Sequence, residues 1–321
     1  MFLADSLGFL DLEGQLEKID PAIKCNLMHV TAAPPWAKSM AEIKKAAEQF
    51  GVVVEKKLNS LWCSRKWELK EVKDNEFWIV SGIQRPPHDV DVKALIDIHE
   101  ISITTLAYNH EESPFGGGWP NKEVGLTERG KQFLEECAEH GMIVDLSHAS
   151  AETTLDALSF AQLRLPKLGI CATHSGCWEI FHHDRNMAEA DMRIIANRGG
   201  YIGIPTLLPI LDDKDEDLRA FRMHLKYVIN ACGEDAVGIG SDAPYCSRPL
   251  SEIYDGYKKL VAKLDTAGHL KPRFPMHPLF LYHPYKLEVI ARELERSFPI
   301  GTVEKIMGLN FRRFLAEYLP K

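Results

Sequence analysis

Short runs of apolar residues recur along the chain, at intervals that leave room for a helix between most of them. Each run is apolar on both faces and rich in β-branched residues, which is typical of parallel strands buried under helices. The eight runs are Phe2–Leu7, Cys25–Thr31, Phe77–Ile83, Ile101–Leu106, Met142–Leu146, Leu168–Thr173, Gly200–Ile204 and Val237–Gly240.

Segments with helical spacing fall between several of these runs. Thr127–Glu139 begins with a residue that can cap a helix, places three apolar side chains on one face and is followed by Gly141 as a stop signal. Apolar residues at i, i+3 and i+4 also predict one final helix over Val303–Tyr318.

Strand candidates that alternate with helices predict the α/β class and a (β/α)8 TIM-like barrel. Because no repeat, low-complexity tract or Gly/Ser linker divides the sequence, residues 1–321 are predicted to form a single domain. A doubly wound open sheet is the alternative fold. No G-x-G-x-x-G or G-x-x-x-x-G-K-[ST] motif follows the early runs, so the usual nucleotide-binding signals of that sheet are missing.

Charge and composition narrow the class of partner. The 321 residues include 38 Lys and Arg against 46 Asp and Glu, a net charge of −8, which argues against nucleic-acid binding. No apolar run approaches the roughly 20 residues of a membrane-spanning helix, so we expect no membrane partner. The N-terminus lacks the basic start of a signal peptide, and seven cysteines in a long chain favour a reducing, cytoplasmic location.

Three of the apolar runs are followed by polar residues. MIVDLSH ends in His148, GICATH ends in His174, and AVGIGSD ends in Asp242. Chemistry in a barrel collects at the C-terminal ends of the strands, so we expect these side chains at one mouth. Two imidazoles and a carboxylate suit a divalent ion such as catalytic zinc, with one position left for water. A strand-end histidine can equally be a hydrogen-bonded core residue, and spacing alone leaves both interpretations open.

Other candidates carry weaker signals. Gly116–Gly118, flanked by Pro114 and Pro120, predict a mobile loop that could close over the site. Arg185 could bind a substrate carboxylate bidentately, although most arginines are surface charge. His29, near the end of its run, is better explained by core or rim packing.

Four blocks of the sequence resemble the renal or membrane dipeptidase family of the amidohydrolase superfamily. They are GLTERGKQFLEECAEHGMIVDLSHAS, ATHSGCWEIFHHDRN, IIANRGGYIGI and GEDAVGIGSD, and their order and spacing match over about residues 77–245. The closing EKIMGLNFRRFL resembles the C-terminal helix of the family. The resemblance implies a (β/α)8-type barrel with two bridged zinc ions that hydrolyses dipeptides.

The resemblance also implies roles for individual residues. His148 and His174 match the two histidines that hold one zinc ion in the family, and Asp242 matches its general acid/base. Arg185 matches the arginine that binds the terminal carboxylate of the substrate. Tyr108–Asn109 fall where relatives place a His or Tyr that contacts the substrate.

The sequence departs from the family pattern at the other zinc ion. The first strand of the family ends in Asp-Gly-His-x-Asp, and the matching ADSLGF places Leu7 and Phe9 at the two ligand positions. Neither side chain has a lone pair to donate to a metal. The bridging glutamate is matched by Gln84, with Ser81 as the alternative alignment, and a neutral amide is a poorer bridge.

These departures predict a reduced metal site. We expect one zinc ion on His148 and His174, with Asp242 and either Gln84 or water completing the shell, because two close cations need anionic ligands. An empty site is the alternative. His29 belongs to the next strand and is not counted as the missing ligand.

Two functions follow from these residues. The first is a metal-dependent, dipeptidase-like hydrolase that cleaves the amide bond of a dipeptide or a similar small carboxylated amide with metal-activated water. The alternative is a non-hydrolytic, metal-free relative that binds a small carboxylated ligand. The first is favoured because His148, His174, Arg185 and Asp242 occur together. Either way, the expected partner is a small molecule or dipeptide, and a homodimer is an assembly common in such barrels.

Overall fold

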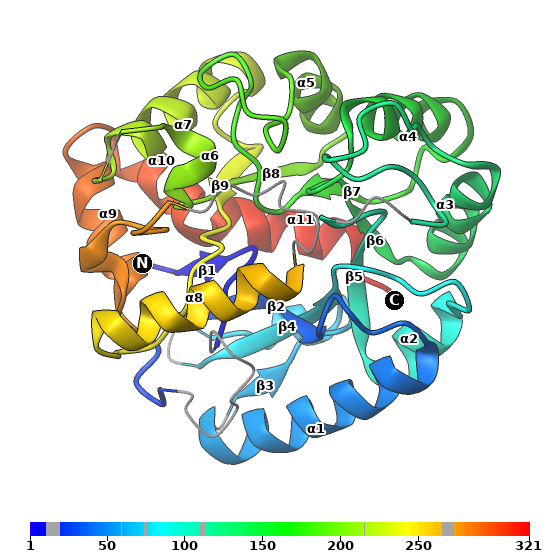
Figure 1. Ribbon diagram of the computed structural model, residues 1–321, viewed down its shortest axis with the longest axis horizontal. Helices are drawn as coiled ribbons and strands as arrows, with labels where there is room; N and C mark the ends of the chain where they lie inside the picture. Colours follow the sequence, from blue (N-terminus) through cyan, green and yellow to red (C-terminus); the bar gives the residue numbers. More distant parts are fainter. Residues whose placement is uncertain (11–19, 59, 74–75, 110–112, 215, 265–272) are drawn as a thin grey trace.

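Parallel strands follow one another around a barrel in the computed structural model, which describes residues 1–321 except 11–19, 59, 74–75, 110–112, 215 and 265–272 (Figure 1). The order around the barrel is β1-β2-β4-β5-β6-β7-β8-β9, and the short β3 pairs with β4 outside this path. The strands are β1 Ala4–Asp5, β2 Leu27–Ala33, β3 Leu61–Trp62, β4 Trp78–Ile83, β5 Ile101–Thr105, β6 Ile143–Asp145, β7 Ile170–Ala172, β8 Tyr201–Ile204 and β9 Val237–Ile239. The predicted (β/α)8 barrel is confirmed, and every strand on the path lies in one of the predicted apolar runs, although β2 extends two residues beyond its run.

Main-chain hydrogen bonds close the barrel between its first and last strands. The Ser6 amide donates to the Ile239 carbonyl at 2.9 Å, and the Asp242 amide donates to the Leu7 carbonyl at 2.9 Å. Phe9 then pairs in parallel with Pro244. The segment after β1 is therefore joined to the segment that carries Asp242.

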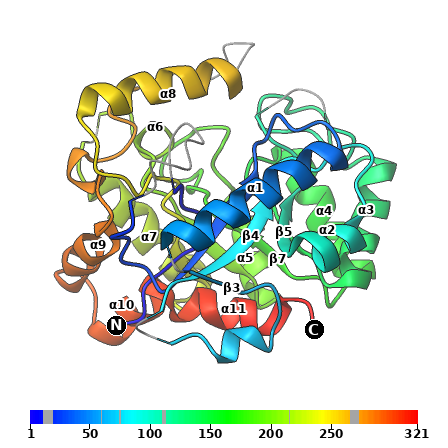
Figure 2. The same ribbon diagram turned by 90° about the horizontal axis from the view of Figure 1, so that it is seen from below.

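Helices surround the barrel (Figures 1 and 2). The α-helices are α1 Met40–Leu58, α2 Val92–His99, α3 Glu128–His140, α4 Ala151–Arg164, α5 Glu189–Asn197, α6 Leu208–Leu211, α7 Arg219–Cys232, α8 Leu250–Leu264, α9 Lys286–Glu295, α10 Ile300–Glu304 and α11 Asn310–Tyr318. Shorter helical turns are η2 Glu68–Lys70, η3 Leu279–Leu281 and η4 Lys305–Leu309. None of the described helices is both long and apolar enough to cross a bilayer.

The helix predicted over Thr127–Glu139 is confirmed with its end signals. The Thr127 hydroxyl accepts a hydrogen bond from the Gly130 amide, and Gly141 ends the helix with a φ of 79°.

The single final helix predicted over Val303–Tyr318 is wrong, because the chain breaks at Gly308 in the π-helical turn η4. A Cβ atom at this glycine would lie 2.8 Å from both the Phe2 carbonyl oxygen and the Phe2 ring. The close approach to the chain before β1 therefore separates α10 from α11.

Helix α11 closes one end of the barrel and leaves the other end for chemistry. Phe311 and Phe314 pack with Val80, Ile103 and Ile143, which come from three successive strands. In Figure 2, α11 lies at one end of the barrel and α8 at the opposite end. The C-terminal ends of the strands, where His148, His174 and Asp242 follow, therefore face away from α11.

Candidate metal centre

Two histidines from neighbouring strand ends face each other at the barrel mouth. His148 follows β6 and His174 follows β7, and their Nε2 atoms lie 2.9 Å apart. Gln84, directly after β4, places its amide nitrogen 3.5 Å from the His174 Nε2 atom. The three residues predicted as metal ligands are thus brought together from three strands.

The outer nitrogen of His148 is held by Asn109. The Trp119 indole N–H, which can only donate, bonds the Asn109 Oδ1 atom at 2.7 Å. The same oxygen lies 2.6 Å from the His148 Nδ1 atom. An oxygen fixed as an acceptor requires Nδ1 to carry the proton, so the Nε2 atom of His148 presents a lone pair.

A second chain of hydrogen bonds fixes His174 in the same way. The Thr173 hydroxyl donates to the Asp145 carboxylate, an acceptor, and lies 2.6 Å from the His174 Nδ1 atom. Because its single proton goes to Asp145, the Thr173 oxygen must accept from Nδ1–H. The Nε2 atom of His174 therefore also presents a lone pair.

The arrangement fits a cation between the two imidazoles. Burial first, then the Arg185 guanidinium, lowers the pKa of both His148 and His174 well below the usual range, so both rings are neutral. Two lone pairs repel at 2.9 Å unless a positive charge lies between them. Nitrogens bound to one zinc ion in tetrahedral geometry are roughly 3.3 Å apart, and outer hydrogen bonds of this kind orient metal-binding histidines.

Two residues at the mouth adopt backbone conformations that non-glycine residues rarely use. His148 has a φ of 70° and Asp242 a φ of 53°. Such conformations cost free energy and persist where surrounding contacts hold them, often at functional sites.

Asp242 lies on the loop after β9, close enough to Arg185 for their charges to interact. Burial raises the pKa of its carboxyl to about 7, with Arg185 opposing the shift and Asp5 and Asp145 adding to it. A group with this pKa can both accept and release a proton near neutral pH.

A buried carboxylate at the end of β1 holds the loop that carries Asp242. Asp5 accepts hydrogen bonds from the Ser241 amide at 2.8 Å, the Tyr245 hydroxyl at 2.7 Å and the Leu7 amide at 3.2 Å. The Ser241 hydroxyl bonds it as well. These bonds fix both sides of the barrel closure next to Asp242.

Arg185 and Tyr108 complete the predicted cluster. Arg185 is buried and donates to the Ser175 hydroxyl at 3.2 Å and the His174 carbonyl at 3.1 Å. Burial lowers its pKa to about 10, so it stays charged at neutral pH. The Tyr108 ring lies 4.3 Å from the His148 ring between centroids. The structure therefore gathers all seven predicted site residues.

The predicted mobile loop over Gly116–Gly118 is tied to the site. The Trp119 amide donates to the His148 carbonyl at 2.8 Å, and the Ser150 amide donates to the Gly117 carbonyl at 2.9 Å. Gly118 also pairs with Ala149. The loop holds His148 from its backbone as well as through Asn109.

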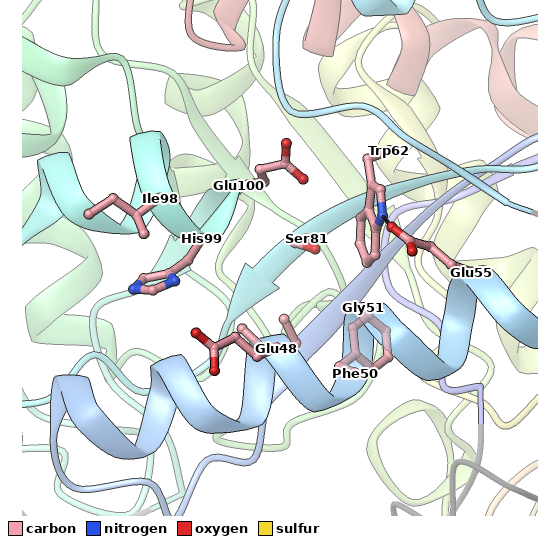
Figure 3. A pocket seen from close by; sticks show the side chains of 11 residues that line it. Glu48, Phe50, Gly51, Glu55, Trp62, Ser81, Ile98, His99 and Glu100 are labelled. Atoms are coloured by element: carbon pink, nitrogen blue, oxygen red, sulfur yellow. Dashed lines mark hydrogen bonds between the residues drawn. The ribbon is translucent and has the colours of Figure 1, made fainter.

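Gln84, and not the alternative Ser81, points toward the histidines. The two residues are three positions apart, so their side chains point to opposite faces of the strand. Ser81 lines a separate cavity of about 150 Å³ on the outer side of the barrel, with Glu48 of α1 and His99 of α2 (Figure 3). That cavity is lined by none of the seven site residues.

The positions of the second family metal site are apolar. Leu7 is fully buried, and Phe9 joins the barrel closure through its backbone. His29 donates from Nδ1 to the Ser6 carbonyl at 2.7 Å, and its buried Nε2 atom has no partner among the described residues. In the described part of the chain, no three His, Cys, Asp or Glu side chains are grouped to hold a metal. The ligand set predicted from the sequence therefore keeps two imidazoles, from His148 and His174, and the neutral Gln84 amide.

Sequence reasoning missed the residues that orient the ligands. Thr173 and Asp145 lie within the apolar runs that precede the two histidines. Polar residues in otherwise apolar runs could have indicated a role in orienting those histidines. Trp119 carried no such signal, because only the fold brings its indole to Asn109.

An imidazole pair, a carboxylate and an arginine follow the C-terminal ends of strands in a (β/α)8 barrel, an arrangement that suits metal-assisted hydrolysis. A model of the membrane dipeptidase family, Peptidase family M19, matches residues 41–272. The chain belongs to this family, and the resemblance inferred from its sequence is confirmed.

Known proteins support this placement. The dipeptidase tcpJ of Claviceps purpurea (strain 20.1) is 29% identical over 197 residues, 60% of this chain and 38% of that protein. The chain thus spans less than half the length of that relative. An amidohydrolase from Pseudomonas aeruginosa has a TM-score of 0.78 at 20% identity, over 99% of this chain and 96% of that one. A metallo peptidase from Rhodobacter sphaeroides, liganded with a phosphinate mimic of the dipeptide L-Ala-D-Ala, has a TM-score of 0.74 at 16% identity, over 99% of both chains. These two structures share the fold.

Proposed function

We propose that the protein is a metal-dependent, dipeptidase-like hydrolase that cleaves the amide bond of a dipeptide or similar small carboxylated amide. The observation that carries this proposal is the His148–His174 pair, whose Nε2 lone pairs face each other at 2.9 Å. The family membership supports the same reaction class.

A single zinc ion held by His148, His174 and Gln84 is the proposed cofactor. A divalent ion supplies Lewis acidity and lowers the pKa of water toward neutrality. The protein contributes neutral imidazoles whose tautomers are already set by Asn109 and Thr173. Little reorganisation is then needed when the ion binds.

Asp242 is proposed to move the proton. With a pKa of about 7, its carboxylate takes a proton from the attacking water and returns it to the nitrogen of the leaving amine. The left-handed backbone at Asp242 and the bonds from Asp5 to its loop keep this carboxylate in place.

Arg185 is proposed to bind the substrate carboxylate. A guanidinium has five N–H donors. The side chain donates to the Ser175 hydroxyl and the His174 carbonyl, which leaves N–H groups for a bidentate contact with a carboxylate. Tyr108, whose ring is tilted against that of His148, would form part of the wall beside the substrate.

A panel of dipeptides tests this function directly. Protein stripped with a chelator is assayed with zinc, cobalt or manganese, and turnover is expected with at least one metal. His148→Ala should abolish it, while His99→Ala, a histidine on the outer face of the barrel, should leave it unchanged. Protein that takes up no metal after zinc loading, as measured by elemental analysis, would rule the proposal out.

The metal-free binding role is the second candidate. It is favoured by Leu7 and Phe9, which offer no ligand where the family has two. Binding of a dipeptide without turnover or metal uptake, retained in His148→Ala, would support this role instead.

A further inference from the structure

The cavity that Ser81 lines on the outer side of the barrel takes no part in the proposed reaction. It lies between α1, the strands β2, β3 and β4, and the C-terminal end of α2, and its volume is about 150 Å³. A cavity of this volume holds a molecule about as large as benzene. Phe50 and Ser81 in its lining are buried, whereas Glu48 and Ile98 are exposed, so the cavity opens to solvent.

Carboxylates dominate the polar lining of this cavity. Glu48 and Glu55 line it from α1, and Glu100 lines it from the end of α2 (Figure 3). None of the described lining residues is a lysine or an arginine, and burial, then Lys44, lowers the pKa of His99, so its imidazole is neutral. Lys44 lies 4.0 Å from Glu48, but both side chains are more than half exposed, and such surface pairs contribute little. The cavity therefore favours a positively charged ligand.

Glu100 is held where a negative charge is unfavourable. It ends α2 with a φ of 53°, a left-handed conformation that non-glycine residues rarely adopt. The C-terminal end of a helix already carries partial negative charge. Burial, and then Glu68, raises the pKa of the Glu100 carboxyl, with Arg65 opposing the shift and Glu55 adding to it. A cation bound between Glu55 and Glu100 would relieve the repulsion between these two carboxylates.

Ser81 adds an unpaired hydroxyl to the carboxylates. The residue is only 3% exposed, and in Figure 3 it lies at the centre of the lining side chains. Its hydroxyl bonds to none of the residues that the structure describes, and Figure 3 shows no hydrogen bond from it to the rest of the lining. A polar group buried without a partner is costly. A ligand with N–H groups would satisfy this oxygen.

An aromatic face borders the same space. The Trp62 indole N–H donates to the Glu55 Oε1 atom at 3.3 Å, and the ring packs edge-on against Phe50. Gly51 of α1 stands beside this ring, and a Cβ atom there would meet only the Trp62 Cζ2 atom, at 3.7 Å. Packing therefore does not require glycine at this helix-interior position, where alanine is more favourable. The missing side chain leaves room for a ligand against the indole, whose face attracts cations.

We propose that this cavity is a binding site for a small organic cation of the alkylguanidinium class. A planar guanidinium stacks on an indole ring and presents several N–H donors at once. Glu55 and Glu100 would accept its hydrogen bonds together with the Ser81 hydroxyl, while Trp62 covers its face. A bare metal ion would leave the indole face and most of the volume unused. The site goes beyond the proposed hydrolase function and does not depend on it.

Matched ligands test the site by direct binding. The full chain is titrated by calorimetry with ethylguanidinium and with ethylurea, which has nearly the same shape and no charge. We expect ethylguanidinium to bind with a dissociation constant of about 1 mM or below. Ethylurea should bind at least about tenfold more weakly, because it forms no charge-assisted hydrogen bonds. Ethylammonium and calcium, titrated in the same way, should also bind more weakly than ethylguanidinium.

Four variants separate recognition from structure. Glu100→Gln removes one charge at the exposed end of α2 and should weaken ethylguanidinium binding about tenfold or more, the range of a hydrogen bond to a charged group. Glu295→Gln makes the same change at the exposed end of α9 and should bind as the wild type does. Gly51→Leu fills the space beside Trp62 without a change of charge and should abolish binding. Val52→Leu, on the exposed side of α1, should retain it.

Three results would overturn the proposal. The first is equal affinity for ethylguanidinium and ethylurea, or binding of neither, since the carboxylates then select no cation. The second is wild-type affinity in Glu100→Gln or in Gly51→Leu, which would place the ligand outside this cavity. The third is tighter binding of calcium or ethylammonium than of ethylguanidinium, which would assign the site to another cation. Because binding alone is measured, failure here leaves the proposed hydrolase function untouched.

Discussion

At the scale of single residues, the site depends on which atoms hold protons. The protonated nitrogen of each histidine is set by a neighbour that can only donate or only accept. The Trp119 indole donates to Asn109, so the Asn109 oxygen accepts from His148. The Asp145 carboxylate accepts from Thr173, so the Thr173 oxygen accepts from His174. His148 and His174 are therefore both neutral, and each presents its Nε2 lone pair. Asp242, in contrast, titrates within the physiological range.

The Asp242 carboxyl predicts a pH dependence of both activity and stability. Its pKa is raised from 3.8 to about 7 on folding, so the native state binds more protons than the unfolded state between these values. Stability contributed by this group therefore falls as pH rises from about 4 to 7. Asp242→Asn should raise the free energy of unfolding of chelator-treated protein at pH 8 and change it little at pH 3.5. Urea unfolding at both pH values measures this.

The same titration should appear in catalysis. The wild-type kcat/KM should rise through about pH 7 as Asp242 loses its proton and becomes a base. Asp242→Asn should lose turnover while keeping zinc. A stability difference between the two proteins that is equal at pH 3.5 and pH 8 would contradict the assignment.

At the scale of elements, the segments that close the barrel are the same segments that position Asp242. Strand β1 ends with Asp5 and is followed by the Leu7 carbonyl, and the segment after β9 supplies Ser241 and Asp242. In the final helical region the local sequence pattern and the structure disagree. The apolar helical pattern continues across Gly308, but the helix is interrupted there, where the chain packs closely against Phe2.

Removing the Asp5 carboxylate should damage both stability and activity. Asp5→Ala leaves the Ser241 amide, the Tyr245 hydroxyl and the Leu7 amide without their acceptor, and we expect a loss of roughly 3 kcal/mol or more. Denaturant unfolding measures the loss. Asp97→Ala is the matched control, because Asp97 pairs with Arg65 at the surface and should matter little. Equal effects of the two substitutions would show that Asp5 does not hold the closure.

At the scale of the whole molecule, the barrel brings residues that are distant in sequence to one end of the fold. Gln84, His148, His174 and Asp242 follow the C-terminal ends of four different strands, which are β4, β6, β7 and β9. An ion bound there would link these strand ends, so occupancy should be coupled to global stability.

Zinc should therefore stabilise the native protein against heat. At a free zinc concentration about a hundredfold above the dissociation constant, the gain is about 2.7 kcal/mol. Thr173→Val removes the acceptor of the His174 Nδ1 proton and should weaken zinc binding by roughly ten- to a hundredfold, shrinking the thermal shift at the same zinc concentration. Thr302→Val, which loses only a bond to Glu234, should keep the full shift. A zinc-induced shift unaffected by Thr173→Val would place the ion elsewhere.

The sequence by itself determined the barrel, its strand positions and the residues at the mouth, because two-sided burial and strand-end polarity are local patterns. Family motifs added Arg185, Tyr108 and Asn109, and the structure brings these to the same mouth. Tertiary structure alone decided the tautomers of His148 and His174, the orientation of Gln84 over Ser81 and the break at Gly308. Each of these depends on a contact between segments that are distant in sequence, and such contacts produce no periodic pattern of apolar and polar residues.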